Sequence, residues 1–228
     1  MKLTAEQIEC INQTLVIKGV KFDDLKMEVL DHIASQIEYE MATTQKTFPE
    51  AYNQVFERWN AEFEPTRAFF SLRTYYPKLA RSKFGNQIKL EIFTTFTIAA
   101  VLFCSFQLVS DSNTKLQFIF WIKKVFFYAY IGTILSMFIF KFLNVKSKVS
   151  STYKHSFDAR FPSIFIWLTL IFNDNIPQDT TNQNLFIPSM GCLFMYLLST
   201  VYLGFKHYQF QKKFSLQYLF TTDSEIVT

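Results

Sequence analysis

The stretch IFTTFTIAAVLFCSFQLV, residues 92–109, runs for 18 residues without a charged side chain. A helix needs about 20 predominantly apolar residues to cross the hydrocarbon core of a bilayer, so this stretch predicts a membrane-spanning helix. Further apolar runs predict spans at about 125–143, 158–174 and 185–205. The third run holds only the 12 residues 161–172 before Asn173 and Asp174, a length that also fits a re-entrant or interfacial segment.

Lys and Arg residues are distributed unevenly around these runs. They gather in 65–91, 144–160 and 206–213, whereas 173–184 has none. Because short loops rich in Lys and Arg stay in the cytoplasm, four spans with both termini cytoplasmic fit this distribution, and three spans would separate the first basic segment from the last. Only the segment before the second span, with Lys115, Lys123 and Lys124, conflicts. The sequence therefore predicts a multi-pass protein of the bacterial inner (cytoplasmic) membrane.

Charge divides the chain into four parts. Residues 1–64, the head, carry six Lys/Arg against twelve Asp/Glu, and residues 65–91, the neck, carry six Lys/Arg against one Glu. The membrane region follows at 92–205 and a tail at 206–228. This pattern is typical of an acidic soluble domain joined by a basic connection to a membrane domain. The three cysteines show no paired spacing, which argues against a disulfide framework or a zinc site of thiolates.

Helix start and end signals divide the head into three predicted helices. Thr4 with Gln7, and Thr47 with Glu50, show the capping-box spacing that begins a helix. Gly19 is a typical helix end, and apolar residues recur at helical spacing between these signals. We therefore predict an all-α fold, with a small three-helix cytoplasmic head followed by a four-helix transmembrane region.

The stretch EVLDHIASQIEYE, residues 28–40, contains the residues of the head that could bind a metal ion or a partner. Glu28 and His32 lie one helical turn apart, a spacing that lets two side chains reach one metal ion. A metal needs further ligands and no HExxH motif is present, so the favoured interpretation is the polar rim of an amphipathic helix, with His32 hydrogen-bonded to Glu28. In the other interpretation, Glu28, Asp31, His32 and Glu38 contact a protein partner. We predict no catalytic, metal-binding or cofactor-binding residue, and no enzymatic activity.

Two motifs in the head resemble a known module. They are FDDL-x-x-EV-x-DHI at 22–33 and TF-x-EA at 47–51. Both are similar to the N-terminal helical module of bacterial membrane proteins called the HAAS or permease-prefix type, and the resemblance covers about residues 4–63. That module precedes transmembrane helices, frequently in proteins linked to PadR-like transcription regulators. This chain has Trp59-Asn60-Ala61 where the group often has a glycine. The resemblance implies an interaction or signalling head on a membrane anchor.

Basic and aromatic residues alternate in the neck. This pattern predicts an interfacial helix, broken near Pro77, on anionic lipid. The residues predicted to contact lipid are Arg67, Arg73, Lys78, Arg81, Lys83 and Lys89. Nucleic-acid binding is the rival interpretation. Because a predicted span begins directly after the neck, lipid is favoured and no nucleic-acid partner is expected.

Small residues in the membrane region predict close helix packing at Gly132, Ser136 and Gly191. The Gly-x-x-x-Ser spacing of Gly132 and Ser136 lets two helices approach each other. Ordinary packing inside one bundle is favoured over a dedicated homo-oligomer contact, which stays open.

The leading functional hypothesis is a signalling or regulatory membrane protein whose acidic head docks a cytoplasmic protein, such as a transcription regulator. The alternative is a small permease or the membrane subunit of a transporter. Its polar path would depend on hydroxyl groups at Thr94, Thr95, Thr97, Ser136, Ser199 and Thr200. No Asp, Glu, Arg or His lies inside the four apolar runs, which argues against a proton-coupled transporter.

Overall fold

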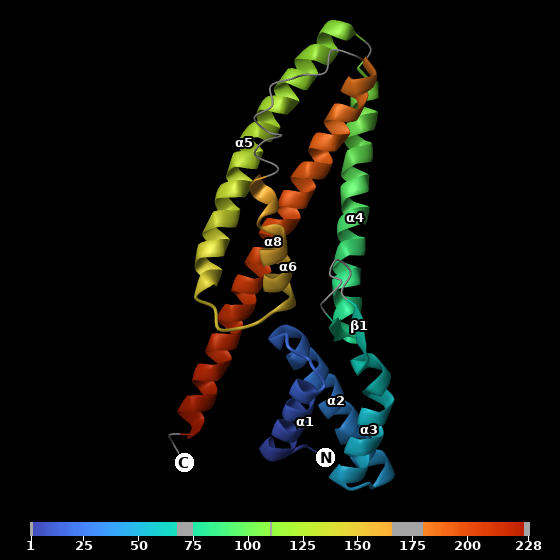
Figure 1. The fold of residues 1–228 in the computed structure, drawn as a ribbon, viewed down its shortest axis with the longest axis vertical. Coiled ribbons are helices and arrows are strands. Elements are labelled where there is room, and N and C mark those ends of the chain that lie inside the picture. Colours follow the sequence, from blue (N-terminus) through green and yellow to red (C-terminus); the bar gives the residue numbers. More distant parts are fainter. Residues whose placement is uncertain (1, 68–74, 110, 166–179, 226–228) are drawn as a thin grey trace. The chain divides into compact units, whose positions relative to one another are not determined.

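A computed structural model describes residues 2–67, 75–109, 111–165 and 180–225 of the chain. These residues are almost all helical, which confirms the predicted all-α class (Figure 1). They form two compact units, described separately below. The first unit comprises Met1–Asn86 with Val149–Thr152, and the second comprises Gln87–Lys148 and Tyr153–Thr228.

The head contains the three predicted helices, α1 (Ala5–Ile17), α2 (Asp23–Thr44) and α3 (Phe48–Phe63). Their apolar stripes meet in one core, in which Ile11, Leu15, Ile33, Ile37 and Val55 are completely buried. Three amphipathic helices of this size cannot bury their apolar faces singly, and packing against one another removes those faces from water.

Both predicted capping patterns are confirmed at their helix starts. Gln7 N donates to Thr4 Oγ1 at 3.3 Å, and Thr4 N donates to Gln7 Oε1 at 2.9 Å. At α3, the Glu50 carboxylate accepts the backbone N–H and the hydroxyl of Thr47, at 2.9 and 2.8 Å. These two bonds, the backbone one first, lower the pKa of Glu50 below its ordinary value, because they favour the charged carboxylate. Gly19 ends α1 with φ of 84°, which glycine adopts without strain.

The neck differs from the predicted interfacial helix. Strands β1 (Pro65–Arg67) and β2 (Tyr75–Pro77) pair antiparallel, with Thr66 opposite Tyr76, and α4 (Lys78–Gln107) begins directly after Pro77. A helix therefore begins after Pro77, but the described neck residues before it form a strand pair and not the predicted helix. Tyr76, Leu79 and Phe84 pack into the core of the first unit. This part of the neck's apolar surface is thus occupied by protein.

The second unit is built from most of α4 together with α5 (Ser112–Val145), α6 (Thr152–Arg160) and α8 (Thr180–Glu225). Three helices in the described residues are long and apolar enough to cross a membrane, rather than the four predicted: Lys78–Gln107, Asn113–Val145 and Phe186–Ser215. Of the predicted third span, 158–174, residues 158–160 end α6, and residues 166–174 lie outside the described part of the chain.

The observed helices are longer than the predicted spans. The predicted spans at 92–109, 125–143 and 185–205 lie almost entirely within α4, α5 and α8, respectively, apart from the last residues of the first. Residues 116–122 and the two lysines that follow them, Lys123 and Lys124, precede the predicted second span but belong to α5 without interruption. The two lysines did not end the helix because long cationic side chains bend away from their backbone positions; Lys124 Nζ lies 5.5 Å from the Trp121 ring centre.

Contacts inside the second unit define the helix directions. The Tyr130 hydroxyl donates to Met190 O at 2.6 Å, and Asn144 Nδ2 donates to Gly204 O at 3.2 Å. The two pairs are separated by 14 residues on α5 and by 14 on α8, so these helices run parallel for about 21 Å at 1.5 Å per residue. Both helices begin at one end of the unit in Figure 1 and descend together.

Three glycines in the second unit have very different surroundings. A Cβ on Gly191 would lie 2.5 Å from Leu102 Cδ1, so α8 approaches α4 closely there, at one of the predicted packing residues. A Cβ on Gly204 would lie 2.9 Å from Phe140 Cβ and 3.0 Å from Phe157 Cε2. By contrast, no described atom other than those of the adjacent residues and the backbone of its own helical turn lies within 4 Å of a Cβ built on Gly132. Gly132 is exposed within this chain, and its carbonyl accepts the hydroxyl of Ser136.

Candidate functional site

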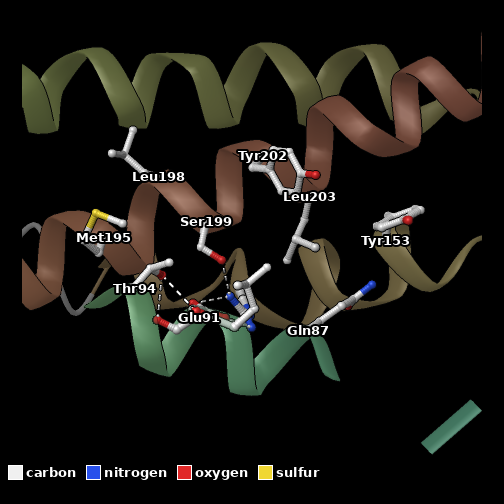
Figure 2. A pocket seen from close by; sticks show the side chains of 11 residues that line it. Gln87, Glu91, Thr94, Tyr153, Met195, Leu198, Ser199, Tyr202 and Leu203 are labelled. Atoms are coloured by element: carbon white, nitrogen blue, oxygen red, sulfur yellow. Dashed lines mark hydrogen bonds and ion pairs between the residues drawn. The ribbon is translucent and has the colours of Figure 1, made fainter. Parts of the chain in front are cut away.

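A cavity of about 390 Å³ opens between α4, α6 and α8 in the second unit (Figure 2). This volume falls in the range that small-molecule sites occupy. One group of lining residues has polar side chains: Gln87, Glu91, Thr94, Tyr153, Arg160, Ser199 and Tyr202. The other walls are the apolar side chains of Leu90, Met195, Leu198 and Leu203. The cavity therefore combines an apolar wall with a polar cluster.

An ion pair between Glu91 and Arg160 is the centre of this cluster. Arg160 Nη1 donates to Glu91 Oε1 at 2.8 Å and Nη2 donates to Oε2 at 2.7 Å, the bidentate geometry in which guanidinium and carboxylate match. Each side chain is 18% exposed, so water screens the pair only partly. The pair joins α4 to the end of α6.

Two α8 residues hold the guanidinium from a second side. Arg160 Nη1 also donates to Ser199 Oγ at 3.1 Å, and the guanidinium carbon lies 5.3 Å from the centre of the Tyr196 ring. A cation over the face of an aromatic ring is attracted by its quadrupole. Contacts on α4 and α8 therefore fix the orientation of Arg160.

Sequence reasoning missed this ion pair because it searched for charges inside the apolar runs. Glu91 directly precedes the run that begins at residue 92, and Arg160 directly precedes the run that begins at residue 161. Two opposite charges, each at the N-terminal end of an apolar run, are the sequence signal from which this ion pair could have been predicted. Of the hydroxyl residues proposed for a transport path, the structure brings Thr94 and Ser199 together at the cavity.

The predicted partner-contact residues lie along α2, mostly in solvent. Glu28, Asp31 and His32 are exposed, whereas Glu38 is half-buried and accepts the backbone N–H of Leu3 at 2.9 Å. The expected hydrogen bond between His32 and Glu28 is replaced: Glu28 accepts from Lys83 Nζ at 2.8 Å. Ser35 and Tyr39 continue the exposed surface. We call Glu28, Asp31, His32, Ser35 and Tyr39 the α2 face.

The first turn of α2 binds a distant segment of the chain within the first unit. Asp24 accepts the backbone N–H of Thr152 at 2.9 Å as well as its hydroxyl, and Lys83 Nζ lies 3.4 Å from the same carboxylate. The neighbouring residues are also hydrogen-bonded through the backbone, because Asp23 N donates to Ser150 O at 2.7 Å. The Asp24 side chain is only 4% exposed, so these partners replace nearly all of its hydration.

The basic residues predicted to contact lipid have varied environments. Lys78 Nζ pairs with Glu62 at 3.1 Å, and Lys83 pairs with Glu28 and Asp24. Arg67, Arg81 and Lys89 are exposed, and Arg73 lies outside the described residues. Lipid contact at these positions stays a prediction. Among the residues that the structure describes, no group of three or more His, Cys, Asp or Glu side chains is placed to hold a metal ion.

Comparison with known proteins finds no matching family model, no matching curated protein and no matching solved structure.

Proposed function

We propose that the chain is an integral protein of the cytoplasmic membrane that crosses it four times and docks a cytoplasmic protein through the α2 face of its head. The parallel course of α5 and α8 supports the fourth crossing. Two parallel spanning helices begin on the same side of a bilayer, and a return crossing between Val145 and Thr180 would satisfy this requirement. The apolar run at 161–172 supplies the residues for this return.

The charge distribution supports an orientation with both termini in the cytoplasm. In a four-crossing chain, the start of α4 and the ends of α5 and α8 share one side, and they carry most of the basic residues of the flanks. Loops rich in Lys and Arg are retained in the cytoplasm. The acidic head then faces the cytoplasm together with the basic flanks.

The composition of the α2 face carries the docking proposal. The face presents Asp31 and Glu28 beside Tyr39, which is 67% exposed although its ring is large and apolar. Tyrosine is enriched at protein interfaces because it combines an apolar ring with a hydroxyl. The head's net charge of −6 favours a basic partner surface. A transcription regulator, as the resemblance to the HAAS-type module implies, is one such partner.

Single cysteines in a cysteine-free background test the topology. A membrane-impermeant thiol reagent applied to intact cells is expected to label a cysteine at Asn113 and one at Gln178, but not one at Lys148. The reason is that 148 follows the end of α5, whereas 113 lies in the first turn of α5 and 178 precedes α8. Labelling of 148 together with 178 would rule out a crossing between them.

Charge reversal on the α2 face tests the docking. Asp31→Lys in the full-length protein is expected to reduce co-purification of a basic cytoplasmic protein about tenfold or more, since like charges facing each other cost several kcal/mol in binding. Glu57→Lys is the matched control, because it makes the same charge change at an exposed position of α3. Equal recovery of every protein by the wild type and Asp31→Lys would exclude this face.

A small permease is the second candidate function, favoured by the presence of Thr94 and Ser199 at one cavity. Proteoliposomes separate the two candidates. Solute uptake that disappears in Ser199→Phe would favour the permease, because the phenyl ring fills the space beside Arg160. Partner binding that survives in Ser199→Phe would in turn assign docking to the head alone.

A further inference from the structure

In the proposed membrane placement, the cavity lies at the depth of lipid headgroups. Its two charged residues each stand immediately before an apolar run, Glu91 before residue 92 and Arg160 before residue 161. The boundary between charged and apolar sequence marks the boundary between headgroups and hydrocarbon. The apolar wall formed by Met195 and Leu198 belongs to the span Phe186–Ser215. A molecule in this cavity therefore meets a polar cluster at the headgroup level and apolar side chains beside it.

Hydrogen-bond donors at Arg160 and Ser199 remain available to a ligand. The guanidinium has five N–H groups, of which Glu91 and Ser199 accept three in the described structure. Ser199 Oγ accepts from Arg160, and within the described residues its own O–H donates to no protein acceptor. Two N–H groups of the guanidinium and the O–H group of Ser199 thus have no protein acceptor among the described residues, and such donors suit the oxygens of a phosphate.

Glu91 determines which kind of phosphate-containing headgroup fits the cavity. Each of its oxygens accepts one bond from Arg160 and retains a further lone pair. The carboxylate balances the charge of Arg160, so the cluster offers no net attraction to a purely anionic headgroup. A primary ammonium within the same ligand would donate to Glu91 while the phosphate accepts from Arg160 and Ser199. The adjacent opposite charges therefore complement a zwitterion.

We propose that the cavity binds a zwitterionic phospholipid with a primary ammonium, a phosphatidylethanolamine, with its phosphate at Arg160 and Ser199 and its ammonium at Glu91. The acyl chains lie along the apolar wall, which holds them at the edge of the hydrocarbon. This inference rests on the membrane placement of the second unit and not on partner docking, so loss of a partner in the docking experiment leaves it unaffected.

Native mass spectrometry of the full-length protein tests the headgroup assignment. Micelles would contain equal amounts of phosphatidylethanolamine, phosphatidylcholine and phosphatidylglycerol with identical acyl chains. Phosphatidylethanolamine adducts are expected to exceed phosphatidylcholine adducts about tenfold, because choline has no N–H to donate to Glu91. Equal retention of these two lipids, or a preference for phosphatidylglycerol, overturns the proposal. Equally strong binding of glycerophosphoethanolamine, which lacks acyl chains, overturns the assignment of the ligand as a membrane lipid.

Two variants assign the selectivity to the cavity. Glu91→Gln keeps the size of the side chain but removes its charge, and is expected to abolish the preference for phosphatidylethanolamine over phosphatidylcholine. Asp158→Asn is the matched control, because it breaks the ion pair with Lys141 outside the cavity and is expected to keep the preference. Should Glu91→Gln fail to fold, Ser199→Ala is expected to weaken both adducts without changing their ratio. A preference unchanged in Glu91→Gln, or a ratio altered in Ser199→Ala, contradicts the assignment.

Discussion

Replacement of Gly204 by alanine is expected to lower the free energy of unfolding of the second unit by about 1–3 kcal/mol, the usual cost of overpacking. The new methyl group would lie 2.9 Å from Phe140 Cβ and 3.0 Å from Phe157 Cε2. Neither neighbour yields easily, since the first is attached to the α5 backbone and Phe157 is completely buried. Thermal unfolding of the full-length protein in detergent, followed by circular dichroism, measures the loss.

Gly132→Ala provides the matched control for this experiment. The added methyl group meets no described atom within 4 Å beyond its own helical turn, and alanine has the higher helix propensity by up to about 1 kcal/mol. The control is therefore expected to be neutral or slightly stabilising. Gly191→Ala should fall between the two, because its close neighbour is the end of the flexible Leu102 side chain. Equal melting temperatures for Gly204→Ala and Gly132→Ala would show that α5, α6 and α8 do not pack as described.

The second large effect is expected at Asp24. Asp24→Ala removes the acceptor for the N–H and hydroxyl of Thr152 and one of the carboxylates that Lys83, which is 20% exposed, pairs with. Deleting one partner of a buried hydrogen-bonded charge costs about 3–5 kcal/mol when no compensation is present. The ion pair between Lys83 and Glu28 remains and offsets part of this cost. We therefore expect the free energy of unfolding of the first unit to fall by about 2–4 kcal/mol.

Hydrogen–deuterium exchange of the full-length protein localises this second effect. In Asp24→Ala, exchange should accelerate in peptides that contain residues 149–152 and the start of α2, because their mutual hydrogen bonds open. Asp31→Ala removes the same carboxylate from an exposed position and is expected to stay within about 0.5 kcal/mol of the wild type. Unchanged protection at residues 149–152 in Asp24→Ala would be inconsistent with the described contact.

The head could be predicted from sequence because its signals are local. A capping box is complete within four residues, as at Thr4 and Gln7, and an apolar stripe is complete within a few turns. The buried face of α2, with Leu25, Val29, Ile33 and Ile37, followed directly from this periodicity. The three long apolar helices were equally accessible, since their length and composition alone distinguish them.

Features that depend on distant residues escaped the same reasoning. From the sequence, Asp24 could be predicted only as an acid in a first helical turn. Its contact with Thr152 could not be predicted, because Thr152 lies 128 positions away. The Glu91–Arg160 pair joins residues 69 positions apart. The strands β1 and β2 have three residues each, too few for an alternating pattern to be recognised. The cavity that we propose to bind a lipid is made entirely of such long-range contacts.

The segment Val149–Thr152 also sets an order for biosynthesis. Sixty-two residues, 87–148, are translated between Asn86 and this segment, which at elongation rates of about 5–20 residues per second takes roughly 3–12 seconds. During that interval the ribosome delivers two long apolar helices, while Asp24 still lacks its Thr152 partner. Completion of the N-terminal unit is therefore timed to follow emergence of the first hydrophobic hairpin from the ribosome.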